Sequence, residues 1–248
     1  MDSLDLTSLV ALLILITAAA VLYSSVGHGG ASGYLAAMAL FGLSSSFMKP
    51  AALIMNIAVA SLTLFRLSRA GYFQWRLFIP FALGSVPAAY LGGAFVITDT
   101  GYKYIVGVAL MIAAARLLWE AEDRAAVNTP KLWISLPMGA GLGFVSGLTG
   151  VGGGIFLSPL LLFLRWTTMR TNAAMAAAFI LVNSIAGLLG HAHIATSWPS
   201  GLPLFVGAAV LGALVGSELG VRRLAPVKLR KLLGVVLVIA ALKMLLTA

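Results

Sequence analysis

Gly27-His28-Gly29-Gly30 interrupts the first apolar part of this chain, and Gly150-Val151-Gly152-Gly153-Gly154 interrupts a later part 123 positions further on. After a four-residue insertion, Gly107-Val108 corresponds in the same way to Gly234-Val235. The chain is therefore predicted to consist of two related halves. Other small residues and prolines also return at the 123-residue offset: Ser61 and Ser184, Pro80 and Pro203, Gly84 and Gly207, Gly93 and Gly216.

The composition is typical of a membrane protein. Of the 248 residues, 61% are hydrophobic and 9% are charged, and the mean hydropathy is +1.05; soluble domains are far less apolar. A chain of this length has room for roughly ten apolar spans of about 20 residues each. Cysteine is absent from the sequence, which excludes disulfides, thiolate metal ligands and cysteine nucleophiles. The predicted fold class is an all-α polytopic membrane protein.

The apolar segments form two sets of five. The polar stretch 120–131 separates them, so we predict a first repeat over 1–119, a cytoplasmic linker over 120–131 and a second repeat over 132–248. The predicted segments are 6–26, 31–47, 51–65, 77–97 and 102–119 in the first repeat, and 132–149, 153–164, 173–190, 201–220 and 226–247 in the second.

The positions of the basic residues indicate how the segments cross the membrane. If every segment reverses side and the chain starts outside, only Lys49, Lys103 and Lys243 of the 16 lysines and arginines lie outside. Cytoplasmic loops are enriched in Lys and Arg, so we predict a bacterial inner-membrane protein with both termini outside. Because five is an odd number, the second repeat is inverted relative to the first. The formal charge of +9 is then a topology signal, and no nucleic-acid partner is expected.

The two glycine clusters are candidate binding sites. Each interrupts an apolar run and precedes an unusually short segment. Backbone that leaves the helix inside a membrane is tolerated where it lines a cavity. A helix that restarts there presents unpaired N–H groups and partial positive charge to an anion. We expect each pair of segments around a cluster to be a re-entrant hairpin or two closely apposed spans. The alternative is that the glycines only allow close helix packing.

Longer motifs surround both clusters. One is the run from Val26 to Leu35, followed by Met48-Lys49-Pro50 and by Asn56-Ile57-Ala58-Val59-Ala60-Ser61; the other is the run from Ser146 to Pro159, followed by Phe179-Ile180-Leu181-Val182-Asn183-Ser184. Together they resemble the TauE/SafE sulfite exporter family over essentially the whole chain. The resemblance implies transport of a small sulfur-containing anion, such as sulfite, sulfoacetate, thiosulfate or a related organosulfonate. Val151 stands where the first half has His28, so the two half-sites differ chemically.

Polar residues near the glycines complete the candidate site. Histidine titrates near neutral pH, so His28 could bind an anion when charged or couple transport to protons; the alternative is a neutral ring bonded to backbone. The Asn56 and Asn183 amides could donate to an oxyanion or bridge helices, and the Thr149 hydroxyl could instead bond to its own helix. No metal or cofactor is expected. The predicted substrate-binding residues are Gly27, His28, Gly29, Gly30, Asn56, Thr149, Gly150, Gly152, Gly153, Gly154 and Asn183.

These features favour a secondary transporter that works by alternating access. A passive anion channel is an alternative, because the same helix ends could line a pore. A rhomboid-like intramembrane protease is a third interpretation, with Ser32 as the nucleophile and His191 or His193 as its base. Against it, Ile155 replaces Ser32 in the second half. We expect no enzyme activity, and we expect a small anion and the lipid bilayer as partners; a homodimer is left open.

Overall fold

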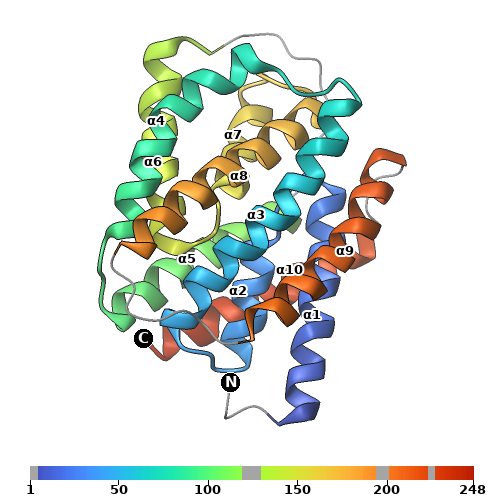
Figure 1. Cartoon of the computed structure of the whole chain (residues 1–248), viewed down its shortest axis with the longest axis vertical. Helices are drawn as coiled ribbons and strands as arrows, with labels where there is room; N and C mark the ends of the chain where they lie inside the picture. Colours follow the sequence, from blue (N-terminus) through green and yellow to red (C-terminus); the bar gives the residue numbers. More distant parts are fainter. Residues whose placement is uncertain (1–4, 119–129, 194–200, 223–226) are drawn as a thin grey trace.

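The computed structural model describes residues 5–118, 130–193, 201–222 and 227–248, and these form helices without any strand (Figure 1). The expected all-α fold is confirmed, while most of the predicted linker 120–131 lies outside the described residues. The helices are α1 (Leu6–Ser25), α2 (Ala31–Leu40), α3 (Ser45–Arg69), α4 (Trp75–Ala94), α5 (Asp99–Leu118), α6 (Leu132–Thr149), α7 (Gly154–Phe163), α8 (Met169–Ala192), α9 (Leu202–Arg222) and α10 (Val227–Leu246).

Two of the helices are too short to cross a membrane. In the described part of the chain, α1, α3, α4, α6, α8 and α9 are long and apolar enough to span. In contrast, α2 and α7 have 10 residues each. Ten residues rise about 15 Å, half of the ~30 Å hydrocarbon core. Each short helix directly follows a glycine cluster, as expected; α2 lies in the lower half of Figure 1 and α7 in the upper half.

The start of α3 differs from the sequence prediction. The Lys49-Pro50 pair suggested a loop, so the predicted segments ended at 47 and resumed at 51; instead, α2 ends at Leu40 and α3 begins at Ser45. The turn between them contains Gly42, whose φ of 72° is left-handed and favours glycine. Pro50 removes a single backbone hydrogen bond near the helix start and does not end the helix. Lys49 is therefore a helical residue and not a loop residue.

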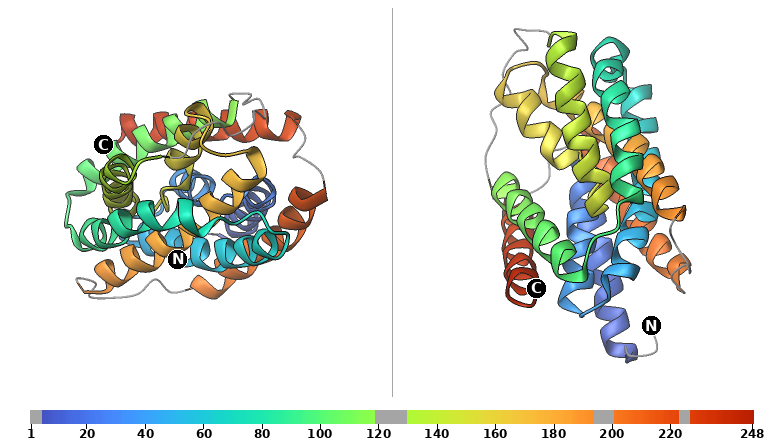
Figure 2. Two further views of the ribbon diagram at one scale, coloured as in Figure 1. Left: turned by 90° about the horizontal axis from the view of Figure 1, so that it is seen from above. Right: turned by 90° about the vertical axis from the view of Figure 1, so that its left-hand side faces the viewer.

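Helices from opposite halves pack in pairs. α1 lies against α9 and α4 against α6, while α3 packs on α8 and α5 on α10. The right-hand view of Figure 2 shows α4 beside α6 towards one end and α5 beside α10 towards the other. Because each pair takes one helix from each half, the two halves interleave. The pairings are also reciprocal, since α1 and α4 of the first half correspond in order to α6 and α9 of the second.

The contact between α4 and α6 depends on glycine. A Cβ atom at Gly143 would lie 2.2 Å from the Ser85 carbonyl oxygen, and one at Gly84 would lie 2.1 Å from that of Leu136. The two backbones therefore approach too closely for any side chain at these positions. Small residues at such contacts are typical of helices that associate in a membrane.

Gly143→Leu is expected to destabilise the protein, because the new side chain must push α6 away from α4; overpacking of this kind costs about 1–3 kcal/mol or more. Gly141→Leu is the matched control, since a Cβ at Gly141 on the same helix would meet no atom within 4 Å. Thermal unfolding of the purified variants in detergent measures the difference. Equal melting temperatures for the two variants would contradict this account of the contact.

Candidate functional site

The two glycine clusters meet inside the protein. A Cβ atom at Gly29 would lie 2.6 Å from Asn56 Oδ1, and one at Gly152 would lie 2.7 Å from Asn56 Nδ2. Both would lie 2.9 Å from Ile180 Cγ2. Gly29 of the first half and Gly152 of the second therefore border the same two side chains, one on α3 and one on α8. All residues of both clusters are buried.

Each cluster starts one of the short helices. Gly30 precedes α2 with φ of 98°, and Gly153 precedes α7 with φ of 75°; glycine adopts these left-handed conformations without strain. The Tyr34 amide donates to the Gly30 carbonyl oxygen at 3.0 Å, and the Phe156 amide donates to that of Gly153 at 3.1 Å. The N–H groups before these have no acceptor within the helix, and neither helix has a side-chain cap. Two helix ends with partial positive charge therefore begin close to Asn56.

His28 connects the first glycine cluster to α7. Its Nδ1 lies 3.1 Å from the Val26 carbonyl oxygen, and its Nε2 lies 2.9 Å from Ser158 Oγ. Because a carbonyl oxygen only accepts, Nδ1 donates to Val26, and Nε2 of the neutral ring accepts from the Ser158 hydroxyl. The Val26 contact is the backbone bond expected of a structural histidine. The Ser158 contact reaches the other half of the protein, so the imidazole of His28 contacts residues of both halves.

Asn56 lies between the clusters with part of its hydrogen-bonding capacity unused. Its Nδ2 lies 3.4 Å from both the Val151 carbonyl oxygen and Ser184 Oγ, beyond the usual N–H···O range of about 2.7–3.2 Å. Its Oδ1 has no hydrogen-bond partner, although the side chain is fully buried. A buried polar atom left unpaired costs about 1–3 kcal/mol. The Nδ2 donors, which make only these long contacts, are the candidate contact for an anion between the two helix ends, because the amide oxygen only accepts hydrogen bonds.

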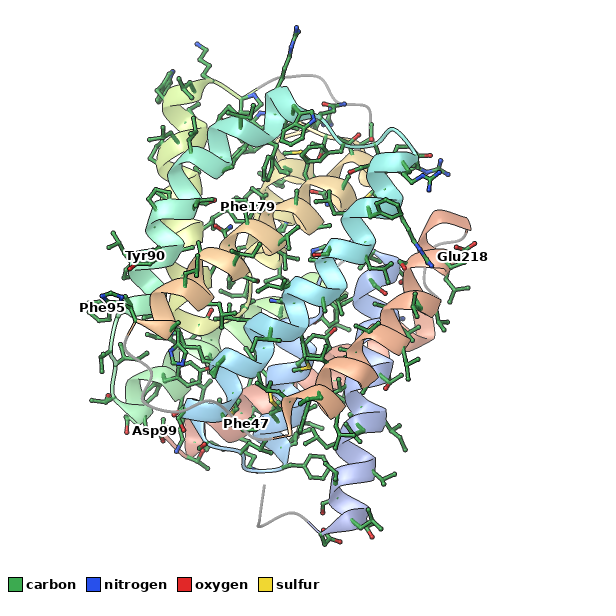
Figure 3. The ribbon with its side chains drawn as sticks, in the orientation of Figure 1. Phe47, Tyr90, Phe95, Asp99, Phe179 and Glu218 are labelled. Carbon is green, nitrogen blue, oxygen red and sulfur yellow. The ribbon has the colours of Figure 1, made fainter. Side chains whose placement is uncertain are left out.

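Asn183 and Ser146 leave further buried polar atoms without partners. Neither amide atom of Asn183 has a hydrogen bond, nor does Ser146 Oγ, and both residues are 0% exposed. Gly153 lies close by, because a Cβ there would be 2.8 Å from Phe179 Cε1 and 3.1 Å from Ser146 Cβ. Phe179 is one turn before Asn183 on α8 and lies in the interior of the bundle (Figure 3). Asn183 therefore shares the α8 face that packs on the second cluster.

The Thr149 hydroxyl forms a hydrogen bond within its own helix, which was the alternative to ligand binding. Its Oγ1 donates to the Val145 carbonyl oxygen of its own helix at 2.7 Å. The same hydroxyl oxygen accepts from the Val151 amide at 3.3 Å. In this conformation Thr149 therefore stabilises the turn at the end of α6.

The outer glycines of the two clusters contact neighbouring helices. A Cβ atom at Gly27 would lie 2.4 Å from Ala173 Cα at the start of α8, and one at Gly150 would lie 3.1 Å from the Lys49 carbonyl oxygen in α3. Gly154 packs on α8. The predicted site glycines thus fall into two groups. Gly29 and Gly152 border Asn56, whereas Gly27, Gly150 and Gly154 allow close packing against neighbouring helices.

Sequence reasoning missed the roles of Tyr23 and Tyr34 around the first cluster. Tyr34 Oη donates to the Gly29 carbonyl oxygen at 2.7 Å, and Ser32 Oγ donates to Tyr23 Oη at 2.6 Å. Ser158, the partner of His28, was missed as well. All of these residues lie within or next to the repeated motifs, which was the available signal. Ser32, the nucleophile of the protease interpretation, donates to a tyrosine and not to a histidine.

The fold and the buried centre define a multi-pass helical membrane protein in which two broken helices meet, an arrangement typical of transporters. The chain matches the family described as Sulfite exporter TauE/SafE over residues 12–244. It belongs to this family, and it is a membrane transporter.

Similar proteins are known from bacteria and an archaeon. A probable membrane transporter protein of Sinorhizobium fredii, y4hK, is 38% identical over 231 residues, which cover 91% of this chain and 94% of that protein. A probable membrane transporter protein of Methanocaldococcus jannaschii, MJ0441, is 26% identical over 198 residues, which cover 75% of this chain and 73% of that protein. One from Xylella fastidiosa is 34% identical over 90 residues, 36% of this chain and 34% of that protein. No solved structure matches the chain.

Proposed function

We propose that this protein is a secondary transporter that moves a small sulfur-containing anion across the bacterial inner membrane by alternating access. Sulfite, sulfoacetate, thiosulfate and related organosulfonates are the substrate class implied by the family. The observation that carries the proposal is the meeting of Gly29 and Gly152 at Asn56, where each half contributes a cluster that begins a half-length helix.

The electrostatics of this centre favour an anion. The helix ends offer N–H donors and partial positive charge, and Asn56 and Asn183 add amides that can donate to an oxyanion. Within the described residues, the carboxylates are Asp5, Asp99 and Glu218, and all three are exposed. A buried site without negative charge binds an anion without having to overcome repulsion.

The packing of the helices supports an inverted repeat. Under the repeat, α1 corresponds to α6 and α9 corresponds to α4, so the α1–α9 pair corresponds to the α6–α4 pair, and both pairs are present. The α3–α8 and α5–α10 pairs each correspond to themselves. Reciprocal pairing of this kind is what a two-fold axis between the halves produces. The opposed loop charges make it an axis in the membrane plane, with both termini outside.

An inverted repeat provides a route to alternating access. Two related arrangements of the same halves, one open to each side, can exchange around a central site. In the present conformation Asn56 and Asn183 are both 0% exposed, which is the state expected between the two openings.

Flux measurements in proteoliposomes test the proposal. Uptake of radiolabelled sulfite, thiosulfate and sulfoacetate should saturate with concentration and should accelerate when unlabelled anion is present on the opposite side. Imposing a pH gradient shows whether protons are coupled to the anion. A steady, non-saturating conductance would support the channel alternative, and the absence of flux for all three anions would reject the proposed substrate class.

A further inference from the structure

Lys49 is a buried cation beside the second glycine cluster. It lies in the second turn of α3 and is 6% exposed, although its sequence position suggested a loop at the surface. Its Nζ donates to the Gly93 carbonyl oxygen at 2.9 Å. Phe47, two residues earlier, lies in the lower part of the molecule in Figure 3, together with Asp99, whereas Glu218 lies at about mid-height on the right. Lys49 thus lies within the protein near one end of α3.

The charge of Lys49 has no carboxylate partner among the described residues. The ion pairs found there join Arg66 to Glu218 at 3.5 Å and Lys103 to Asp99 at 3.0 Å. An ammonium group has three donors, and the Gly93 carbonyl oxygen accepts from one of them. Burying a cation away from water is expensive unless an opposite charge accompanies it, and ionisable residues inside a membrane mark substrate paths.

The position of Lys49 links it to the candidate site. A Cβ atom at Gly150 would lie 3.5 Å from Lys49 Cγ, so the lysine stem passes over the start of the second cluster. Seven residues later on α3, Asn56 contacts Val151 and borders Gly152. Seven residues of helix rise about 10 Å. Lys49 and Asn56 therefore both lie beside the backbone of the second cluster. Lys49 lies beside its first residue, Gly150, and Asn56 lies beside Gly152.

We propose that the Lys49 ammonium forms an anion subsite at one end of the substrate path, where a small sulfur oxyanion takes the place of the Gly93 carbonyl oxygen. This inference rests on the proposed function. The simpler alternative is that Lys49 only caps α4, because Gly93 is among the last four residues of that helix and its carbonyl has no intrahelical donor.

At the first cluster, the position equivalent to Lys49 is uncharged. Gly27 corresponds to Gly150 and contacts the start of α8 at Ala173, as Gly150 contacts α3 at Lys49. The residue of α8 that corresponds to Lys49 is Asn172, a neutral amide that is 3% exposed and whose Oδ1 has no hydrogen-bond partner. The path therefore has a lysine at one of the two equivalent positions and a neutral amide at the other.

Lys243 provides a matched control for the capping alternative. Its Nζ donates to the carbonyl oxygen of Leu40, the last residue of α2, at 2.8 Å. Both lysines thus cap the end of a helix, but only Lys49 borders a glycine cluster. Lys49→Met and Lys243→Met should both lower the melting temperature. Only Lys49→Met should weaken binding of the anion, by about 10-fold or more for a lost charge-assisted hydrogen bond.

The test is calorimetric titration of the purified protein with sulfite, thiosulfate and sulfoacetate in turn. Because the sequence has no cysteine, Lys49→Cys also provides a unique thiol. Aminoethylation of this thiol by bromoethylamine restores an ammonium group of similar length and should restore binding, whereas carbamidomethylation by iodoacetamide should not; mass spectrometry verifies both products.

If the Lys49→Met variant binds the anion with an affinity within twofold of wild type but has a lowered melting temperature, Lys49 is only a helix cap. The proposed function would then stand. The same conclusion follows if aminoethylated and carbamidomethylated Lys49→Cys bind equally well. Wild-type protein that binds none of the three anions would overturn both this inference and the proposed substrate class.

Discussion

Gly29→Leu and Gly153→Leu should each abolish anion transport while the protein still accumulates in the membrane. At Gly29 the first atom of a side chain would lie 2.6 Å from Asn56 Oδ1. At Gly153 it would lie 2.8 Å from Phe179 Cε1, on a residue whose φ of 75° already disfavours any side chain. A leucine therefore cannot fit between the clusters without displacing these side chains and distorting the start of α2 or α7. Uptake of labelled anions into proteoliposomes, normalised to reconstituted protein, measures the loss.

The control is Gly207→Leu, because Gly207 is exposed on α9 and a Cβ there would meet no atom within 4 Å. It should transport at the wild-type rate. Gly29→Ala is the milder substitution at the same position, because a methyl group costs less overpacking than an isobutyl group. Comparing it with Gly29→Leu distinguishes loss of the binding site from loss of the fold. If Gly29→Leu and Gly153→Leu both transport normally, the glycines serve packing alone and the substrate passes elsewhere.

Local features of the sequence were enough to predict most of the fold. Apolar runs show which residues belong in lipid, and two glycine clusters before short runs predicted that α2 and α7 would be short. The start of α3 was missed because Lys49 and Pro50 both suggest a loop, and their effect on the helix depends on what surrounds them. Lys49 is buried, and its hydrogen bond to the Gly93 carbonyl oxygen on another helix could not be read from its neighbours in the sequence.

The site was harder to predict, because it depends on contacts between residues far apart in the chain. The sequence identified His28 and Asn56, but it did not indicate that Ser158, 130 positions away, would bind the imidazole. Nor did it indicate that Gly29 and Gly152 would border one asparagine. Residue type alone could not decide between the two interpretations of Thr149, since the same hydroxyl can bond to a ligand or to its own helix.

The proposed alternating access needs parts of the protein that move against one another as units. The α4–α6 pair is held by glycines against backbone carbonyls, and the α1–α9 pair repeats this at Gly216, where a Cβ would lie 2.1 Å from the Val21 carbonyl oxygen. Contacts so close leave little freedom for the two helices to slide. We therefore expect each pair to move as one body, with the glycine clusters between them as the place where the path opens.

His28→Ala should weaken anion binding and remove part of its pH dependence. Protonated His28 donates from both ring nitrogens, and a hydrogen bond from a charged group contributes about 1.5–3 kcal/mol, so the variant should bind roughly 10- to 100-fold more weakly. In the wild type, binding should strengthen as the pH falls through the range in which the imidazole gains its proton. A sulfonate such as isethionate is the right probe, because its charge stays fixed while the pH changes. Isothermal titration across the pH range measures both effects.

Two variants distinguish the role of His28 from those of its neighbours. Asn183→Ala removes a neutral donor, so it should cost about 0.5–1.5 kcal/mol and leave the pH profile unchanged. Ser158→Ala removes the hydroxyl that contacts Nε2 but keeps the Val26 contact at Nδ1, so the imidazole stays in place and can still gain a proton. It should therefore keep the pH dependence of the wild type. His28→Ala that retains both affinity and pH profile would show that the imidazole only joins the halves through Val26 and Ser158, and that the anion depends on the helix ends and the asparagine amides.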